Sequence, residues 1–384
     1  MTDRIALVGT GADPDDPDSD GFAMAYRHAA GYQRIDGCEL VACADIVREN
    51  AEAFADAHDI SAKGVYEDYE TMLSEVEPDV VSVTVPPAIH ADIVVGCAET
   101  EIPDAIHCEK PMATSWADCR RMADACDDAG IRLTINHQRR TGPIFREAKS
   151  LLDEGAIGDL RRIEWSTKNL FDAGTHLFDL SMFYTDETAV EWVLAGLDYR
   201  EENRWFGTHN ENQAIAQWKY ENGVYGLAAT GRGSDLIDPY LALSGTDGRI
   251  ELGASDGAPL RYRSSDTSGW KAVDTDENVW GDPLPSKFRA GLDLAAQRVP
   301  GVPDDLFGVD YPSHIDRAIA EVIRAHRTES DSVLDASVAL KGTELIFAAY
   351  ESVRRRGRVD LPLTVDDNPL ESMVEEGLVA VGAE

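Results

Sequence analysis

Two stretches of the sequence carry side chains that could move protons on a small-molecule substrate. The first is residues 107–112, His-Cys-Glu-Lys-Pro-Met, which follow an apolar segment and precede a helical pattern over 114–129. Lys110 is therefore predicted where a strand gives way to a loop, the place at which ligands of doubly wound folds collect. Its ammonium group could act there beside a bound cofactor. The competing interpretation is a surface Glu109–Lys110 pair before a turn proline.

The second stretch is residues 172–176, Asp-Ala-Gly-Thr-His. Thr175 is predicted to cap a helix, which places His176 in the first helical turn with Asp179 on the same face. The helix dipole disfavours a positive charge there, so the imidazole is expected to be neutral and able to accept a proton. Asp172 in the preceding loop is expected to orient the ring. Taken singly, Asp172 could equally be a turn former and His176 a structural histidine.

A glycine-rich turn near the amino terminus indicates a nucleotide-binding loop. A short apolar strand pattern ends in Gly9-Thr10-Gly11, and glycines there let the backbone approach a pyrophosphate at a helix N-terminus. The third glycine of the G-x-G-x-x-G pattern is missing because Pro14 takes its place. Gly21 is expected to take over its packing role.

The end of the next predicted strand, residues 39–44, is followed by Asp45. An acid at this position can accept hydrogen bonds from the ribose hydroxyls of NAD and repels the 2′-phosphate of NADP. Arg48 lies three residues further on and could bind that phosphate. NAD is therefore the expected cofactor, with NADP possible. Asp45 is also predicted to cap a helix over 48–58, and the two roles are compatible.

Two further strand exits are predicted to contact the cofactor. One strand ends in Val85-Pro86, and another leads into Glu109 and Lys110. His90 begins the helix after the first of these exits. It either lines the ligand site or caps that helix.

The substrate is expected to contact the two catalytic stretches and a polar segment that follows the last predicted strand of this half, 131–135. That segment includes Arg139, and Lys168 lies at the end of a later strand. The predicted substrate-binding residues are Lys110, Arg139, Lys168, Asp172 and His176.

The order of the predicted elements defines an α/β protein of two domains. Strands alternate with helices up to residue 135, which predicts a Rossmann-type, doubly wound parallel sheet. Residues 136–365 carry short alternating strands separated by turns and are expected to form an α+β domain with a large, open, mainly antiparallel sheet. Residues 366–384 are expected to be an acidic tail that frays.

Composition points to concentrated salt. The chain has 384 residues, with 71 acidic and 35 basic side chains and a formal net charge of −36. Such self-repulsion opposes compaction in dilute buffer, whereas about 1 M salt screens it over about 3 Å. Lysine is scarce, and the acids are spread along the chain. This bias resembles haloarchaeal proteins, and we expect a molar-salt cytoplasm.

Several partner classes are not expected. Nucleic acid binding needs clustered Lys and Arg, and no run is long enough to span a bilayer. The cysteines lack a C-x-x-C pair, so neither zinc nor a disulfide framework is indicated. The acidic insertion 13–20 holds half of a calcium-loop signature, but Arg27 stands where the bidentate glutamate belongs. We therefore expect no metal site and a cytoplasmic protein.

The ordered motifs resemble those of the Gfo/Idh/MocA oxidoreductases, the family of glucose-fructose oxidoreductase and inositol dehydrogenase. The likeness extends to about residue 363 and rests on Gly9-Thr10-Gly11, Asp45, Glu109-Lys110-Pro111, Asp172-x-Gly174-Thr175-His176 and Val359-Asp360-Leu361-Pro362-Leu363. The resemblance implies a catalytic trio of Lys110, Asp172 and His176 and a cis peptide before Pro111. It also implies a homodimer or homotetramer formed through the carboxyl-terminal sheet.

The function implied by this resemblance is hydride transfer between a nicotinamide cofactor and a secondary alcohol of a sugar, polyol or sugar acid. Such a reaction needs a base, a donor for the developing alkoxide and a positioned hydride acceptor. His176 is expected to accept the proton and Lys110 to hydrogen-bond the substrate oxygen, although the residues do not decide which is the formal base. Two alternatives are an NAD-dependent glycosidase with transient substrate oxidation and a non-catalytic NAD-binding protein.

Overall fold

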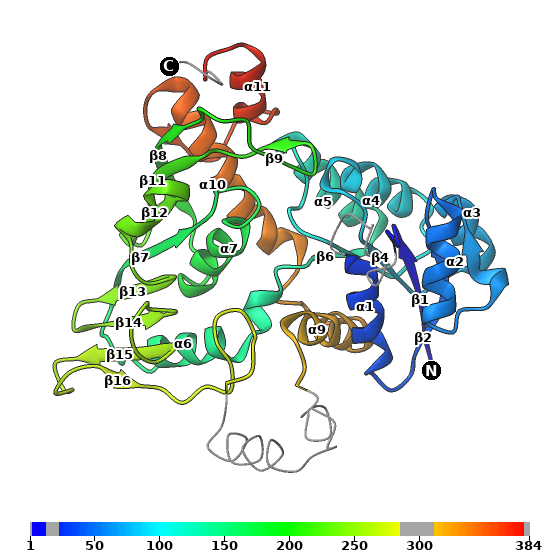
Figure 1. Ribbon diagram of the computed structural model, residues 1–384, viewed down its shortest axis with the longest axis horizontal. Helices are drawn as coiled ribbons and strands as arrows, with labels where there is room; N and C mark the ends of the chain where they lie inside the picture. The colour runs from blue at the N-terminus through cyan, green and yellow to red at the C-terminus, as the bar shows by residue number, and fades with distance from the viewer. Residues whose placement is uncertain (1, 13–22, 285–310, 380–384) are drawn as a thin grey trace, which may run out of the picture.

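Two helix-covered sheets stand side by side in the structure, a computed structural model that describes residues 2–12, 23–284 and 311–379 (Figure 1). The amino-terminal half of the chain forms one sheet and the carboxyl-terminal half forms the other. The acidic insertion 13–20 and Gly21, with the roles predicted for them, lie outside the described residues.

The amino-terminal sheet has six parallel strands in the order β3-β2-β1-β4-β5-β6. The strands are β1 (Asp3–Val8), β2 (Cys38–Ala44), β3 (Val65–Tyr66), β4 (Val80–Val83), β5 (Ala105–Cys108) and β6 (Arg132–Ile135). Their apolar runs are buried because helices cover both faces. The strand order reverses between β1 and β4, which confirms the predicted doubly wound fold and places a ligand crevice at this point.

Helices from both halves of the chain cover this sheet. The amino-terminal helices are α1 (Met24–Gln33), α2 (Arg48–Ala57), α3 (Tyr69–Val76), α4 (His90–Glu99) and α5 (Trp116–Ala129). Helix α9 (His314–Thr328) packs beside α1 and belongs to the same buried apolar cluster as Ile5 and Leu7 of β1. The predicted boundary at residue 135 places α9 in the second domain by sequence, and in space this helix covers the first sheet.

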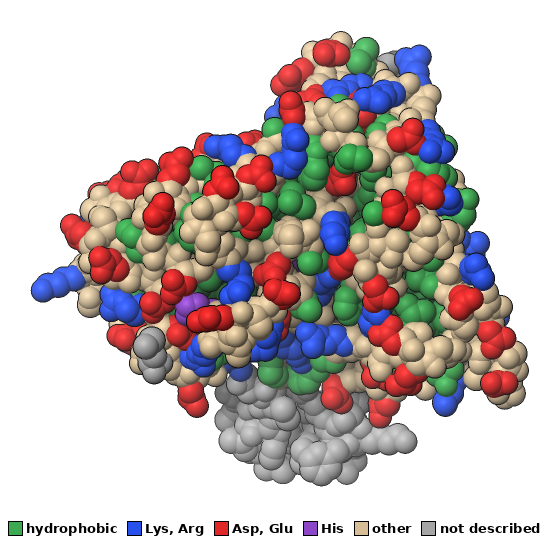
Figure 2. Space-filling model, turned by 180° about the vertical axis from the view of Figure 1, so that it is seen from behind, with side chains coloured by type: hydrophobic (Ala, Val, Ile, Leu, Met, Phe, Trp, Pro, Cys, Tyr) green, Lys and Arg blue, Asp and Glu red, His purple; other side chains and the backbone are tan. Residues whose placement is uncertain are grey.

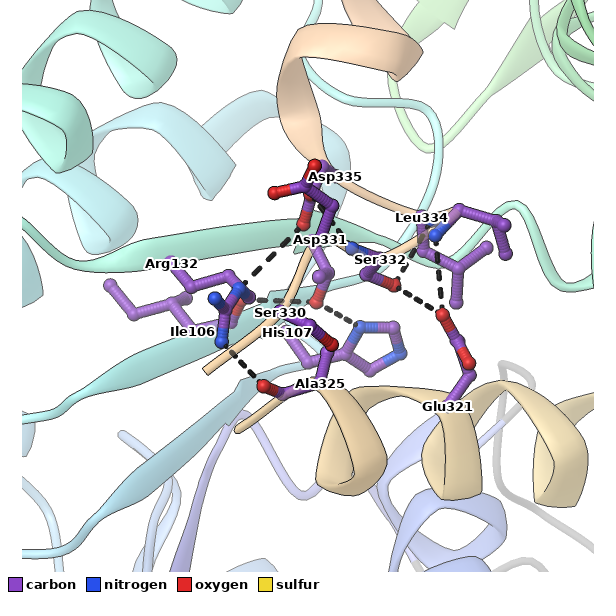
Figure 3. A network of polar contacts seen from close by, with 12 residues as sticks. Ile106, His107, Arg132, Glu321, Ala325, Ser330, Asp331, Ser332, Leu334 and Asp335 are labelled. Atoms are coloured by element: carbon purple, nitrogen blue, oxygen red, sulfur yellow. Dashed lines mark hydrogen bonds and ion pairs between the residues drawn. The ribbon is translucent and has the colours of Figure 1, made fainter. Parts of the chain in front are cut away.

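The segment after α9 is tied to the first sheet (Figure 3). The backbone nitrogen of Ile135 donates to the carbonyl of Leu334, and Arg132 donates to the carbonyl of Ala325 at 2.9 Å. Glu321 on α9 accepts from Ser332 at 3.1 Å. These bonds hold the returning chain along β6 before it enters the second unit.

The second sheet has nine strands, and only β7 and β12 pair in parallel. In spatial order the strands are β16 (Lys271–Ala272), β15 (Leu260–Ser264), β14 (Gly248–Leu252), β13 (Leu241–Gly245), β7 (Leu160–Thr167), β12 (Tyr225–Thr230), β11 (Gln213–Tyr220), β8 (Val190–Asp198) and β17 (Val359–Asp360). This confirms the predicted open, mainly antiparallel sheet. Helices α6 (Pro143–Asp153), α7 (Thr175–Tyr184) and α10 (Ala336–Arg355) pack on its inner face.

Aromatic side chains fill the core between this sheet and α7. Phe178 of α7 lies 4.9 Å from Trp165 and 5.1 Å from Trp218, measured between ring centroids. A Cβ at Gly226 would come within 1.9 Å of the Trp218 ring, so glycine is required there. Well-packed rings at this position hold α7, and therefore His176, rigidly against the sheet.

The carboxyl-terminal segment is folded, contrary to prediction, as far as residue 379. Helix α11 (Pro369–Glu375) begins after Asn368, whose side chain caps the backbone nitrogens of the first turn. Leu370 and Met373 are buried against the core. Residues 380–384 lie outside the described chain.

No helix within the described ranges combines the length and the apolar character that crossing a bilayer requires.

Candidate active site between the two sheets

A cavity of about 560 Å³ opens at the carboxyl ends of the parallel strands. Its walls come from the loops after β1, β2, β4 and β5, and from the start of α7 in the second unit. Trp205 and Phe206, from the hairpin of β9 (Arg204–Trp205) and β10 (Thr208–His209), also line it. The cavity brings together these predicted site residues: Gly9, Thr10, Gly11, Asp45, Val85, Pro86, Glu109, Lys110, Asp172 and His176.

The glycine turn has the geometry that a nucleotide-binding loop needs. Gly9 and Gly11 adopt positive φ angles of 85° and 66°. A Cβ on Gly9 would lie 2.4 Å from a methyl carbon of Val85, whereas one on Gly11 would meet no atom within 4 Å. The turn therefore packs tightly against the end of β4 while its other glycine leaves the backbone open. These features fit a dinucleotide pyrophosphate.

Asp45 organises the turn instead of capping a helix. Its Oδ2 accepts hydrogen bonds from the Gly11 nitrogen at 3.0 Å and the Thr10 hydroxyl at 3.1 Å. Its Oδ1 accepts from the nitrogen of Val47, and Val47 is the N-cap residue of α2. The predicted capping role is therefore wrong. The carboxylate oxygens keep lone pairs for ribose hydroxyls.

Arg48 is not part of the cavity lining. Its side chain is exposed and pairs with Glu52 on the next helical turn at 2.8 Å. The residue beside Asp45 in the cavity is Ile46, which is 90% exposed. An apolar side chain so open to solvent suits the face of an adenine ring. The sequence analysis did not single out Ile46, although its position directly after Asp45 could have indicated this role.

Lys110 and Asp172 form an ion pair across the cavity. Lys110 Nζ lies 2.8 Å from Asp172 Oδ1, and both side chains are 21% exposed. The peptide between Lys110 and Pro111 is cis, as the resemblance implied. Asp172 therefore holds the lysine and not, as predicted, the histidine.

His176 lies at the start of α7 with a ring that makes no hydrogen bond to any described residue. The N-cap is Gly174, and the Thr175 hydroxyl instead bonds to Nε2 of His137 at 2.9 Å, so the predicted Thr175 cap is wrong. The ring of His137 meets that of His176 at a centroid distance of 5.9 Å.

Asp179, which was predicted on the same helix face as His176, is engaged by other side chains. Asp179 is bound by Arg140, whose Nε lies 2.6 Å from Asp179 Oδ2. Burial lowers the pKa of His176 well below its usual value, and the charges of Arg139 and Lys110 lower it further. The imidazole is therefore neutral at physiological pH.

A buried polar network supports the loop that carries Lys110. Glu109 accepts hydrogen bonds from Asn136 at 2.6 Å and bonds to His28 at 2.9 Å, and its other oxygen accepts from the Lys110 nitrogen at 3.1 Å. Although burial opposes ionisation, these partners lower the pKa of Glu109 to about 2. A glutamate predicted to contact the cofactor thus also fixes the backbone before Pro111.

The other predicted site residues lie around the cavity. His90 is fully buried, does not line the cavity and does not cap α4, whose N-cap is Ile89. Its nitrogens lie 2.8 Å from the Val85 carbonyl and 3.0 Å from the Pro111 carbonyl, so it braces two cavity loops. Lys168 is exposed and outside the lining.

Arg139 stands next to Gln138, which does line the cavity. Arg139 is not part of the lining, and its guanidinium group lies against the rings of Tyr240 and Trp280, which also contact each other. In the described part of the chain, no group of three or more His, Cys, Asp or Glu side chains could hold a metal ion.

Comparison with known proteins assigns the chain to a family. Residues 4–137 match the family model described as "Oxidoreductase family, NAD-binding Rossmann fold", and residues 149–361 match "Oxidoreductase family, C-terminal alpha/beta domain". The chain therefore belongs to the Gfo/Idh/MocA oxidoreductases, and its first domain is the family's NAD-binding domain.

Individual relatives are more distant. Inositol 2-dehydrogenase of Salmonella paratyphi B is 34% identical over 125 residues, which are 32% of this chain and 36% of the relative. D-xylose 1-dehydrogenase [NADP(+)] of Haloarcula marismortui is 25% identical over 243 residues, 56% of this chain and 65% of the relative. The chain thus matches about a third of the length of the first of these and about two thirds of the second. A levoglucosan dehydrogenase solved with NADH and levoglucosan superimposes with a TM-score of 0.73 at 19% identity, over 94% of this chain and all of the other.

Proposed function

We propose that the protein is an NAD-dependent dehydrogenase of a secondary alcohol on a sugar, polyol or sugar acid. The observation that carries this proposal is the meeting of Lys110, from the end of β5, with Asp172 and His176, from the second unit, in the cavity that also contains the glycine turn. The names of the inositol and xylose dehydrogenases and the NADH-bound levoglucosan dehydrogenase support it.

The division of labour follows from the hydrogen-bonding state of each side chain. The ammonium of Lys110 is already held by Asp172, so it is suited to donate a further hydrogen bond to the substrate oxygen. The His176 ring is neutral and makes no hydrogen bond to the described residues, so it is suited to accept the hydroxyl proton. A bound nicotinamide would supply the hydride acceptor.

The cofactor would be held by the turn at Gly9 and Gly11 and by Asp45. NAD is proposed over NADP because the Asp45 carboxylate repels a 2′-phosphate and Arg48 is paired with Glu52 outside the lining. Because the name of the Haloarcula relative specifies NADP, both NAD and NADP should be assayed.

We further propose that the outer face of the second sheet joins two copies of the chain. Leu194, Ile215 and Tyr225 on neighbouring strands are exposed large side chains, between 38% and 43% accessible. Adjacent exposed apolar residues on an open sheet suit a self-complementary contact between copies. Mass measurement in molar KCl tests this, and a monomer there contradicts it.

The proposed working environment is a molar-salt cytoplasm. The formal charge of −36 supports it, as does the even spread of acidic side chains over the visible face in Figure 2. A Haloarcula protein among the relatives agrees with this proposal.

The test of the activity is a turnover assay in 2–3 M KCl, about the salt range in which self-repulsion is screened. NADH absorbance is followed with paired polyols, sugars and sugar acids, beside a chromogenic glycoside assay. Net NADH formation supports the dehydrogenase. Glycoside cleavage without net NADH indicates the glycosidase alternative, and NAD binding without either reaction indicates a non-catalytic protein.

A further inference from the structure

Arg139 packs against two aromatic rings and has no acidic partner among the described residues. Its guanidinium carbon lies 5.0 Å from the ring centroid of Tyr240 and 5.1 Å from that of Trp280. Nη1 is sealed from solvent without a hydrogen-bond partner, and the side chain forms no ion pair with any described residue. Aromatic rings attract the face of a guanidinium but leave the donors at its edge unused.

The neighbouring arginine shows what this chain does with a buried guanidinium that has a structural role. Arg140 lies 2.6 Å from Asp179 and 2.6 Å from Glu187. With 71 acidic against 35 basic residues, carboxylates are abundant. No carboxylate of the described residues pairs with Arg139, and burying an unpaired guanidinium destabilises the folded state. A ligand carboxylate could supply the contact.

Arg139 acts electrostatically on the proposed catalytic groups. The charge of Asp172 raises the pKa of Arg139 while burial lowers it to about 10, and the charge of Arg139 lowers the pKa of His176. Arg139 is not itself among the lining residues, but it directly follows Gln138, which lines the cavity together with Asp172 and His176.

The other cations near Gln138 have carboxylate partners. Lys110 pairs with Asp172, and Arg317 and His314 engage the buried Glu277 at 3.0 Å and 2.7 Å. Arg139 has no such partner among the described residues. One unpaired guanidinium can neutralise one carboxylate, whereas a phosphate monoester brings about two negative charges.

We propose that Arg139 binds a carboxylate of the substrate, and that the substrate is a sugar acid whose secondary alcohol reacts at Lys110 and His176. This inference rests on the proposed dehydrogenase function and selects one substrate class within it. A bound carboxylate would also offset the charge of Arg139, which otherwise opposes proton uptake by His176.

The experiment uses the full chain in molar KCl with matched substrate pairs. Gluconate is compared with sorbitol, galactonate with galactitol, and 6-phosphogluconate and glucose 6-phosphate test the phosphate. The variants are Arg139→Gln and Arg139→Lys. Arg263→Gln is the matched control, because Arg263 on β15 of the second sheet also lies over a tryptophan ring, that of Trp270.

The expected result is turnover of an aldonate in preference to its alditol. Arg139→Gln should raise KM for the aldonate by about 10- to 100-fold, with a smaller change in kcat and no change in NAD affinity. Arg139→Lys should recover part of the loss, and Arg263→Gln should behave as the wild type. A preference for neutral polyols or phosphate esters, or an equal loss for acid and polyol, overturns the inference but leaves the dehydrogenase standing.

A binding arm separates the two proposals. Thermal shift by each aldonate is measured with NADH present, for the wild type and Arg139→Gln. A shift that depends on Arg139 supports the carboxylate site even without turnover, and in that case the dehydrogenase proposal fails. An aldonate shift that Arg139→Gln retains, or no shift with any acid, overturns the carboxylate site.

Discussion

Lys110 lies in the first unit and His176 in the second, and both line the same cavity. They differ in charge and in hydrogen bonding. The lysine is paired with Asp172, and the histidine is neutral and makes no hydrogen bond to the described residues. The sequence predicted that these three side chains meet. It did not predict that Asp172 holds Lys110, because this ion pair depends on how the loop before α7 lies against the loop after β5 in the folded chain.

Replacing either proposed catalytic group should abolish most of the activity. We expect Lys110→Ala and His176→Ala each to lower kcat/KM by about two to four orders of magnitude, because each loses an interaction with the reacting oxygen or its proton. Lys63→Ala, which changes an exposed lysine that does not line the cavity, is the control. Steady-state kinetics that leave both alanine variants near wild-type rates contradict the assignment.

Some helices and strands could be predicted from the sequence and others could not. The parallel strands were recognisable as buried apolar runs, and β7, β11 and β12 as alternating ones. β8 was not predicted, because its burial pattern does not alternate cleanly. The apolar face of α9 includes Ile315 and Ile319, but such a face does not reveal which of two sheets it covers.

The two glycines of the amino-terminal turn should respond differently to alanine. Gly9→Ala pushes a Cβ against Val85, so it should lower the melting temperature by several degrees. A Cβ at Gly11 meets no protein atom and would instead occupy space proposed for the pyrophosphate, so Gly11→Ala should weaken NAD binding. Its positive φ should add only a smaller loss of stability. Calorimetric melts and NAD titrations check this, and equal effects of the two changes on both quantities contradict it.

Buried histidines should make the fold acid-labile. Burial lowers the pKa of His107 on β5 from 6.5 to about 3, and that of His176 falls in the same direction. The folded state then binds fewer protons than the unfolded state below pH 6.5, so stability is lost as pH falls from about 6.5 toward 3. The loss is on the order of 1.4 kcal/mol per pH unit for each histidine.

Chemical unfolding between pH 7.5 and 4.5 in constant KCl measures this slope. His107→Asn should make the slope shallower, since one of the titrating groups is gone. A slope that is unchanged in the variant, or stability that does not fall below pH 6.5, contradicts the assignment.

At the scale of the whole molecule, net charge governs stability. Acidic side chains are scattered over much of the visible face in Figure 2, while the cavity carboxylates of Asp172 and Asp45 are held by Lys110 and by the Gly11 nitrogen. Salt should therefore act mainly on the surface repulsion and far less on the paired site.

We expect the melting temperature to rise steeply between dilute buffer and about 1 M KCl and then to level off as the screening length shortens. Circular dichroism melts across a KCl series, with sucrose at matched osmolality as the control, measure this. Equal stability in dilute buffer and molar KCl is the contrary outcome.

The most direct test of the central claim is a crystal structure of the wild-type chain with NADH and gluconate. The account predicts the nicotinamide in the cavity between the two sheets, with the reacting hydroxyl within about 3.2 Å of both Lys110 Nζ and a nitrogen of His176. A dinucleotide bound elsewhere, or a hydroxyl that contacts neither side chain, contradicts the account.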